Sequence, residues 1–239
     1  MNDLLNWIPS GSWTVFYILL GLTIFILMGK TVLGWVLIAP SKSGLVEKKW
    51  SLLGELPNGR IIATKGEAGI QADLLSPGLH FWKWWWMYSV TQIDPVLIPT
   101  GKIGIVNAEN GASLESGAIL AKTVVDSNNF QDAKAFLDGQ GIIGIQRQFL
   151  RNGIYRINKA LFRIEICEAV EISEGKIGIV TVFDGKAIQK GEIAARQKVT
   201  HQKFQDADQF LNNGGERGLQ EEILPPGDYY INPKFAKVE

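Results

Sequence analysis

Residues 215–229 read GERGLQEEILPPGDY, and the same pattern occurs three times in the chain. Residues 141–155 and 66–80 keep its spacing, with a histidine at position 80 where the other two copies have a tyrosine. The shared form is Gly-x-x-Gly-[Ile/Leu]-Gln-x-x-x-Leu-x-x-Gly-x-[His/Tyr]. Its repetition predicts a chain built from copies of one structural unit, which we call a module. The residues that we assign to the joint of each module are Gly69, Gln71 and Gly78, then Gly144, Gln146 and Gly153, then Gly218, Gln220 and Gly227.

The second and third copies align over most of their length. Residues 101–158 match residues 175–232 without a gap, and the sequence FQDA at 130–133 recurs at 204–207. The first copy opens at Lys42 and lacks the segment that contains FQDA. We therefore expect a flank and membrane helix over residues 1–40, and modules over residues 41–100, 101–174 and 175–239.

Each module reads as strand-rich. Short β-branched runs predict buried strands at residues 103–106 and 177–183. Asn-Gly at 110–111 and Asp-Gly at 184–185 are typical of hairpin turns, and the residues from Tyr155 and from Tyr229 are expected to start a returning strand. The expected class is α+β, with short helices laid across the sheets.

The segment that contains FQDA is expected to be helical, because its apolar residues recur at helical spacing in both copies. Asn128 or Asn129 is expected to cap the first of these helices, and Gly139 and Gly214 to end the two. The recurring Asp132 and Asp206 fit a helix cap or surface contact better than a paired-carboxylate site, because duplication explains their recurrence.

The joint itself is interpreted as an element of folding rather than a binding loop. We expect its Gly-Leu-Gln segment to make a further helical turn. Its glycines are expected at turns and close-packing positions, and its glutamines are expected to bond backbone groups.

The amino-terminal part predicts a membrane anchor. Residues 13–38 are almost entirely apolar, and a helix over them would be about 39 Å long. That length exceeds the hydrocarbon core of a bilayer, about 30 Å. Ser10 or Ser12 is the expected cap, and Pro40 the expected stop. A signal peptide fits poorly because residues 1–12 contain no lysine or arginine, and a buried core helix seldom runs so long without polar residues.

The distribution of lysines predicts the orientation of this helix. The flank before it carries only Asp3, whereas Lys30, Lys42, Lys48 and Lys49 lie at its other end or beyond. The positive-inside bias places the amino terminus outside the cell membrane and the body in the cytoplasm, in a single-pass protein.

A dense aromatic run follows the first Pro-Gly turn. Residues 81–88 read FWKWWWMY, which neither a core strand nor a water-facing strand explains well. Tryptophan and tyrosine favour the headgroup level of a bilayer. The residues expected at the membrane interface are Trp82, Lys83, Trp84, Trp85, Trp86 and Tyr88. Packing against the other modules or a neighbouring subunit is the alternative.

Composition and motifs do not indicate an enzyme. Basic and acidic residues balance at 24 each, so no overall field favours nucleic acid as a partner. Cys167 is the single cysteine and lacks a CxxC or histidine neighbour, and His80 and His201 occur in unrelated contexts. No nucleotide-loop, serine-hydrolase or metalloprotease motif is present. We expect no catalytic residue, cofactor or metal, and a structural role for His80.

The first module resembles the start of an SPFH (band 7) domain, the superfamily of stomatin, prohibitin, flotillin and HflK/HflC. The resemblance lies in KSGLVEKK at 42–49, LPNGRII at 56–62 and SPGLHF at 76–81, directly after a single anchor. The repeated FQDA segment is similar to the larger bacterial flotillin-like members. Such proteins usually continue into a long coiled coil, so we expect either a short relative or a fragment of a longer chain.

This resemblance implies a non-enzymatic membrane scaffold. Copies are expected to assemble into a large homo-oligomeric ring or cage that organises a membrane microdomain, its lipids or client membrane proteins. One alternative is a regulatory subunit of a membrane protease, as in HflK/HflC. Another is a lipid-binding module that acts as a monomer or small oligomer.

Overall fold

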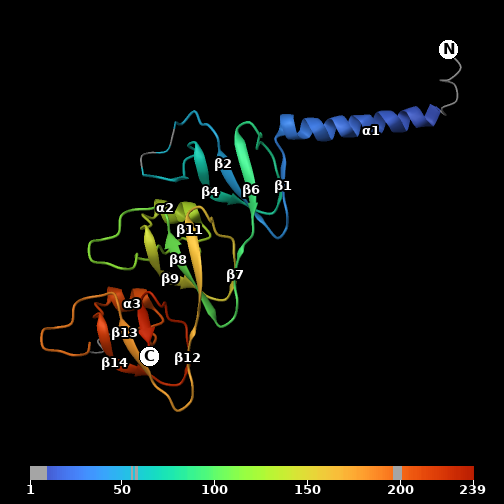
Figure 1. Cartoon of the computed structure of the whole chain (residues 1–239). Helices are drawn as coiled ribbons and strands as arrows, with labels where there is room; N and C mark the ends of the chain where they lie inside the picture. Colours follow the sequence, from blue (N-terminus) through green and yellow to red (C-terminus); the bar gives the residue numbers. More distant parts are fainter. Residues whose placement is uncertain (1–9, 55, 57–58, 196–200) are drawn as a thin grey trace.

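A computed structural model describes residues 10–54, 56, 59–195 and 201–239. The amino-terminal flank (1–9), Glu55, two residues of the quoted resemblance (57 and 58) and residues 196–200 lie outside this range, as do the side chains of Ser10, Ser12 and Lys30. The described elements form a row of three strand groups, with one long helix at the end of the first group (Figure 1). The mixed, strand-rich class with few helices agrees with the predicted α+β class.

The long helix is shorter than expected. Helix α1 spans Ser10–Met28, a single π-helical stretch η1 spans Gly29–Leu33, and strand β1 begins at Val36. The expected helix to Ile38 is therefore wrong at its end. Gly34 interrupts it with φ 57°, and a Cβ there would lie 2.7 Å from the backbone nitrogen of Trp84, so only glycine fits this close approach. Residues 36–38 form a strand that pairs with another strand of the body, instead of continuing the helix.

The helix α1–η1 has the properties of a membrane-spanning segment. Residues 13–33 are long and apolar enough to cross a bilayer. Large side chains along α1, from Trp13 to Met28, are exposed rather than packed against the body. The exposure argues against a buried core helix, in which these side chains would be covered.

Three sheets form the centres of the three strand groups. Their orders are β6-β2-β4-β3, β11-β8-β9 and β16-β13-β14, and every pair except β3-β4 is antiparallel. The strands of the first sheet are β2 (Ser43–Lys48), β3 (Ile62–Ala63), β4 (Gly69–Leu75) and β6 (Tyr88–Ile93). Those of the second are β8 (Lys102–Ala108), β9 (Gly144–Leu150) and β11 (Phe162–Glu168), and those of the third are β13 (Gly178–Val182), β14 (Gly218–Leu224) and β16 (Ala236–Val238).

A two-stranded antiparallel ribbon accompanies each sheet. The pairs are β1 (Val36–Ile38) with β5 (Gly78–His80), β7 (Val96–Ile98) with β10 (Gly153–Tyr155), and β12 (Val170–Ile172) with β15 (Gly227–Tyr229). Each ribbon joins a strand that precedes the central strand to one that begins at the last glycine of the joint. We use module 1 for β1–β6, module 2 for β7–β11 and module 3 for β12–β16.

These pairings shift the expected module boundaries. Strands β7 and β12 pair with later strands, so they belong with the residues that follow them, not with the preceding 41–100 and 101–174 segments. The returning strands begin at Phe162 and Ala236, later than the tyrosines suggested, because Tyr155 and Tyr229 end ribbon strands. Residues 110–111 and 184–185 do not form hairpins. Gly111 instead lies against the backbone of Gly141, where a Cβ would be 2.3 Å from the carbonyl oxygen.

Two short helices occupy the FQDA segments. Helix α2 spans Ala133–Asp138 and α3 spans Ala207–Asn212. The side chains of Asp132 and Asp206 cap them by accepting from the backbone nitrogens of Ala135 and Gln209. The cap role of the recurring aspartates is confirmed. The expected caps at Asn128 or Asn129 are wrong, because these residues adopt positive φ before the helix starts, and α3 is closed by Asn213 rather than Gly214.

The joint segments are strands, not helical turns. Each of β4, β9 and β14 begins at the second glycine of the pattern, and the glutamine follows two residues later. The pairing register shifts at this point in all three sheets, so each strand carries a bulge. The helical expectation failed because the glycine has φ above 100° in each copy, which breaks a helix and opens the bulge.

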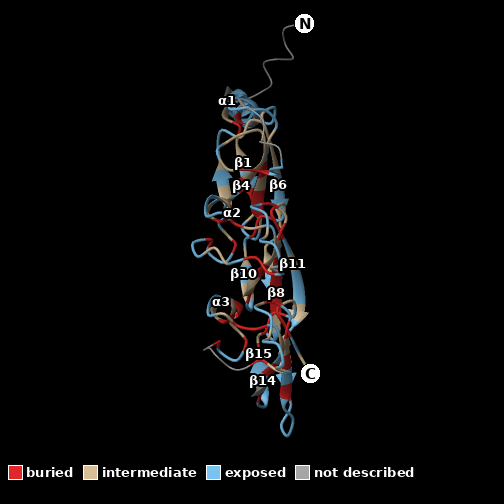
Figure 2. Cartoon of the chain, turned by 90° about the vertical axis from the view of Figure 1, so that its left-hand side faces the viewer, coloured by how far each residue is buried: buried red, intermediate tan, exposed pale blue. Residues whose placement is uncertain are grey.

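The modules are stacked along one axis and share two cores. The first core joins Phe130, Phe136 and Phe162 of module 2 to Ile62 and Ala72 of module 1. The second joins Phe204, Phe210 and Phe235 of module 3 to Leu120 of module 2, with Ile145 packed against it. Helices α2 and α3 lie at the two module junctions (Figure 1), where they contact β4 and β9. Figure 2 shows buried residues distributed along the whole stack rather than at one centre.

A buried asparagine crosses each junction. Asn158 Nδ2 of module 2 donates to the carbonyl oxygens of Gln71 and Ala72 in module 1, at 3.0 Å each. Asn232 Nδ2 of module 3 donates to the carbonyl oxygen of Gln146 in module 2 at 3.2 Å. The bulge exposes these carbonyls to the next module, so the joint of one module is bonded by an amide of its neighbour.

We predict that Asn232→Ala loosens the junction between modules 2 and 3. Loss of the amide leaves the Gln146 carbonyl buried without this donor, at a cost of about 1–3 kcal/mol. Hydrogen exchange of the intact protein in detergent should accelerate at β13 and β14. Asn152→Ala, at an exposed turn, is the matched control. Exchange at β13 and β14 that is equal in the two variants would contradict the role of this bond.

Candidate functional site

The aromatic run forms a compact turn between β5 and β6, which we call the tryptophan turn (residues 81–87). Trp84 and Trp86 stack with ring centroids 5.8 Å apart, and Trp82 meets Trp84 edge-on at 5.8 Å. Trp50, which follows β2, extends the stack by packing on Trp86 at 5.6 Å. Four indole rings thus form one continuous aromatic surface.

Hydrogen bonds fix the tryptophan turn to the end of the long helix. Trp84 Nε1 donates to the carbonyl oxygen of Val32 at 2.9 Å. The backbone nitrogens of Trp82 and Lys83 donate to the carbonyl oxygens of Leu33 and Gly34, at 2.9 and 2.8 Å. These donors satisfy carbonyls at the helix end that have no partner within the helix. Helix and module 1 are therefore held in one orientation.

The tryptophan turn is exposed to an unusual degree for indole rings. Trp82 and Trp85 are 61% and 64% exposed, and Trp86 is 44% exposed. Lys83 Nζ lies 4.9 Å from the centre of the Tyr88 ring, and Lys49 Nζ donates to the carbonyl oxygen of Trp85 at 2.9 Å. The surface combines large apolar rings with two ammonium groups, a composition suited to an interface between apolar and charged phases.

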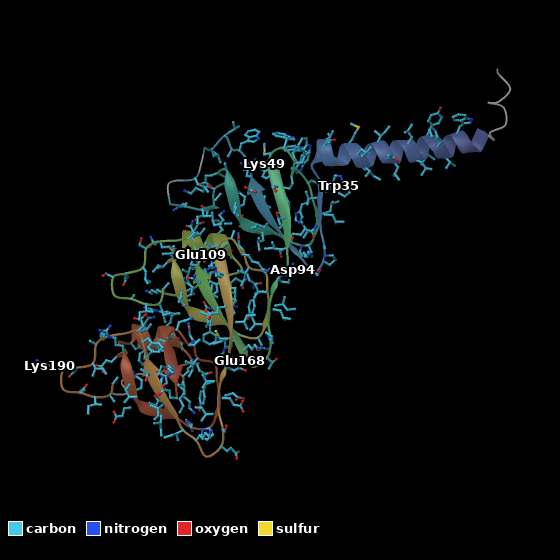
Figure 3. All side chains as sticks on the ribbon, in the orientation of Figure 1. Trp35, Lys49, Asp94, Glu109, Glu168 and Lys190 are labelled. Carbon is cyan, nitrogen blue, oxygen red and sulfur yellow. The ribbon has the colours of Figure 1, made fainter. Side chains whose placement is uncertain are left out.

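An open groove of about 450 Å³ lies beside the turn. Trp35, at the start of the body (Figure 3), lines it together with Lys83, Trp85 and Tyr88. The structure brings together all six residues predicted for this surface, and adds Trp35 and Trp50. The contribution of Trp50 was missed because the residue lies more than thirty positions earlier in the sequence, and only the pairing of β2 with β6 brings it close.

The three joint glutamines make the same pair of bonds. Nε2 of Gln71, Gln146 and Gln220 donates to the carbonyl oxygens of residues four and two positions earlier, at 2.8–2.9 Å. His80 also acts locally, because its Nε2 lies 2.7 Å from the Ser76 carbonyl oxygen. Tyr229, at the corresponding place, donates to the Pro225 carbonyl oxygen at 2.9 Å. These side chains form hydrogen bonds with the backbone of their own segments and do not gather around a shared cavity.

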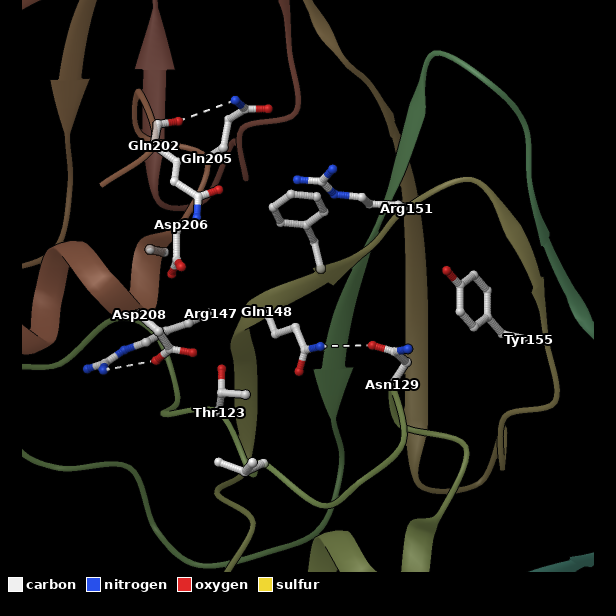
Figure 4. A pocket seen from close by; sticks show the side chains of 13 residues that line it. Thr123, Asn129, Arg147, Gln148, Arg151, Tyr155, Gln202, Gln205, Asp206 and Asp208 are labelled. Carbon is white, nitrogen blue, oxygen red and sulfur yellow. Dashed lines mark hydrogen bonds and ion pairs between the residues drawn. The ribbon is translucent and has the colours of Figure 1, made fainter. Parts of the chain in front are cut away.

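A second, polar groove of about 550 Å³ lies at the junction of modules 2 and 3 (Figure 4). Arg147 Nη1 is 3.4 Å from Asp208 Oδ1, and Gln148 Nε2 donates to Asn129 Oδ1 at 2.9 Å. The first of these pairs crosses the junction, whereas the second lies within module 2. Among the described residues, no group of three or more histidine, cysteine or acidic side chains is placed to hold a metal ion.

Neither His201 nor Cys167 lines either groove. His201 is buried, accepts from the backbone nitrogen of Phe204 at Nδ1 and approaches Glu222 Oε2 at 3.0 Å through Nε2. Partial burial raises the pKa of the Cys167 thiol, and neighbouring Glu165 adds to the effect. A raised pKa disfavours the thiolate, which is the nucleophilic form.

Comparison of the chain with protein-family models, with curated proteins and with solved structures gave no match.

We predict that Cys167 reacts slowly with iodoacetamide in the folded protein. The raised thiol pKa lowers the thiolate fraction near neutral pH, so the rate should still climb at pH values where an unfolded thiol has levelled off. The measurement is the pH profile of alkylation, by mass spectrometry, for folded and urea-unfolded protein. A folded profile that levels off at the same or a lower pH would contradict the prediction.

Proposed function

We propose that the protein is a non-enzymatic membrane scaffold, held in the bilayer by α1–η1 and assembled through its three modules into a large homo-oligomer. One observation carries the proposal. An exposed apolar helix of membrane-spanning length ends on a surface of four exposed or half-exposed tryptophans, and backbone bonds join the two. Neither apolar surface suits exposure to water. The helix matches the hydrocarbon core of a bilayer, and the tryptophan surface matches its interface.

The three modules are, in this proposal, copies of one SPFH-like unit. Three features support common descent: the same order of ribbon and sheet pairings, the same glutamine bonds at the joint, and the same asparagine across each junction. Three independent origins of these features are improbable. The insertion of α2 and α3 distinguishes modules 2 and 3 from module 1.

The tryptophan turn is proposed to lie at the headgroup level on the cytoplasmic side. Its rings would sit among the headgroups, and Lys49 and Lys83 would meet lipid phosphates. Lys42, Lys48 and Lys49 follow the helix and belong to module 1. The positive-inside bias therefore supports a cytoplasmic position of module 1.

The lateral strand edges support assembly. Strands β6 and β11 are at the edges of their sheets, and among the described residues no further strand covers them. Strand β11 carries Arg163, Glu165 and Glu168, which form ion pairs within the chain with Glu109, Lys234 and Lys102. Such a charged edge fits a polar contact better than uncontrolled strand pairing. Membrane anchoring raises the local concentration of copies, so many weak contacts of this kind suffice for a stable assembly. The assembly would organise lipids or client membrane proteins.

We predict a very large particle after extraction in a mild detergent. Electron microscopy and mass photometry should find closed rings or cages far above the mass of a 26.4 kDa chain in its micelle. Reversing the charge of the β11 edge, with Arg163→Glu, should reduce the particle size. A monomer or small oligomer over a range of gentle detergents would refute the scaffold and favour the isolated lipid-binding module.

We also predict that the tryptophan turn contacts lipid. Replacement of Trp84, Trp85 and Trp86 by phenylalanine keeps aromatic packing but removes three fluorophores. In liposomes with brominated lipid, the quenched fraction of the remaining fluorescence should fall relative to the wild type. Trp50→Phe combined with the triple variant should lower it further, and a quenched fraction that does not change in either variant would exclude the contact.

A further inference from the structure

The three ribbons each present one side-chain pair to the outside. The strands are three residues long, and the middle residues are directly opposite each other in the register: Leu37 with Leu79, Leu97 with Ile154, and Glu171 with Asp228. In every case both middle residues are exposed. The exposed pair is aliphatic in the first two ribbons and a pair of carboxylates in the third.

The exposure of the aliphatic pairs is large. Leu37 and Leu79 are 60% and 49% exposed, and Leu97 and Ile154 are 61% and 67% exposed. A short ribbon that faced only water would carry polar residues at such positions, as the third ribbon does. Two aliphatic pairs at matching places therefore indicate an apolar partner, unlike apolar residues scattered singly over a surface.

The ribbons lie on the side of the stack from which the long helix departs. Figure 1 shows β1, β7 and β12 along one flank, and α1 runs outward from the top of that flank at a steep angle to the stack. A bilayer crossed by α1 therefore faces this flank. The third ribbon is the farthest from α1, and it is the one with carboxylates.

Two charged groups near the ribbons differ in the same direction. Arg156 directly follows β10, and its Nη2 lies 3.5 Å from the carbonyl oxygen of Pro40 near β1, so a guanidinium sits between the first two ribbons. The third ribbon has Glu174 close behind Glu171. Basic groups attract the anionic headgroups of a membrane surface, whereas carboxylates are repelled by them.

We propose that the ribbons of modules 1 and 2 insert the pairs Leu37–Leu79 and Leu97–Ile154 into the membrane surface, while the ribbon of module 3 stays in water. The stack of modules then runs along the bilayer surface and contacts it at three places: the tryptophan turn and the two exposed aliphatic pairs. Transmembrane helices tilt by about 20° on average, and a tilt toward this flank would move the second ribbon closer to the lipid without a change in the body. The inference rests on the proposed anchoring by α1.

Single labels on the full-length chain test this arrangement. In a Cys167→Ser background, Leu97→Cys and Glu171→Cys are each labelled with bimane and reconstituted into liposomes of phosphatidylcholine and phosphatidylglycerol. Quenching is measured with a lipid that carries a nitroxide near its headgroup, and separately with aqueous iodide. Bimane at position 97 should be quenched by the nitroxide lipid at least twofold more than at position 171, and iodide should give the reverse order.

Other outcomes overturn the proposal. A label at position 97 that iodide reaches freely shows a ribbon in water, and a label protected from both quenchers shows a protein, such as a second copy, in place of lipid. Leu20→Cys in α1 serves as the anchor control, and it is measured with a lipid that carries the nitroxide on its acyl chain. Nitroxide quenching at position 20 without quenching at 97 refutes only the ribbon contact, whereas absence at both positions refutes the anchoring as well. Ile154→Cys repeats the test on the opposite strand and should agree with position 97.

Discussion

A bulge held open by a glutamine recurs in the joint strand of each module, and the stacking of the modules depends on it. The side chains of Gln71, Gln146 and Gln220 bond carbonyls of their own segment, which fixes the local backbone. The displaced backbone then pairs in parallel with a buried alanine segment, at Ala63, Ala121 and Ala195. Its remaining carbonyls, in the first two modules, accept the asparagine of the next module. Local conformation and long-range packing are thus set by the same few atoms, which is why the pattern of glycines and glutamine is so regular in the sequence.

The junction between the helix and module 1 also depends on a few backbone positions. Gly34 ends the helix in a left-handed conformation, and no side chain would fit there beside the backbone of Trp84. The carbonyls left at the helix end receive donors from the tryptophan turn. A flexible linker would let the body rotate freely relative to α1. Here the aromatic surface, the groove beside it and the flank of ribbons keep a defined direction relative to α1, and the fold of module 1 encodes that direction.

Much of this architecture could be predicted from the sequence, and the failures have clear physical origins. The apolar helix, the aspartate caps and the local role of the glutamines follow from composition and spacing. The end of the helix was placed too late because Val36-Leu37-Ile38 is as apolar as the segment before it, and only its likeness to Val96-Leu97-Ile98 marks it as a strand. The joint was misread as helical because its strand is interrupted by a bulge, which hides the alternation of a strand. Trp50 and the ribbon pairs depend on registers between distant segments, which no local pattern reveals.

The order of the strands has a consequence for synthesis. The last strand of each sheet leads almost directly into the first strand of the next module, from Ile93 to Val96 and from Glu168 to Val170. A sheet is thus completed just before its successor begins to emerge from the ribosome, and α1 precedes them all. Contacts join residues within a module or in adjacent modules, so a longer stack would not need more distant partners to meet. Folding slows as contacting residues become more distant in sequence, and growth of this chain by whole modules would not increase that separation.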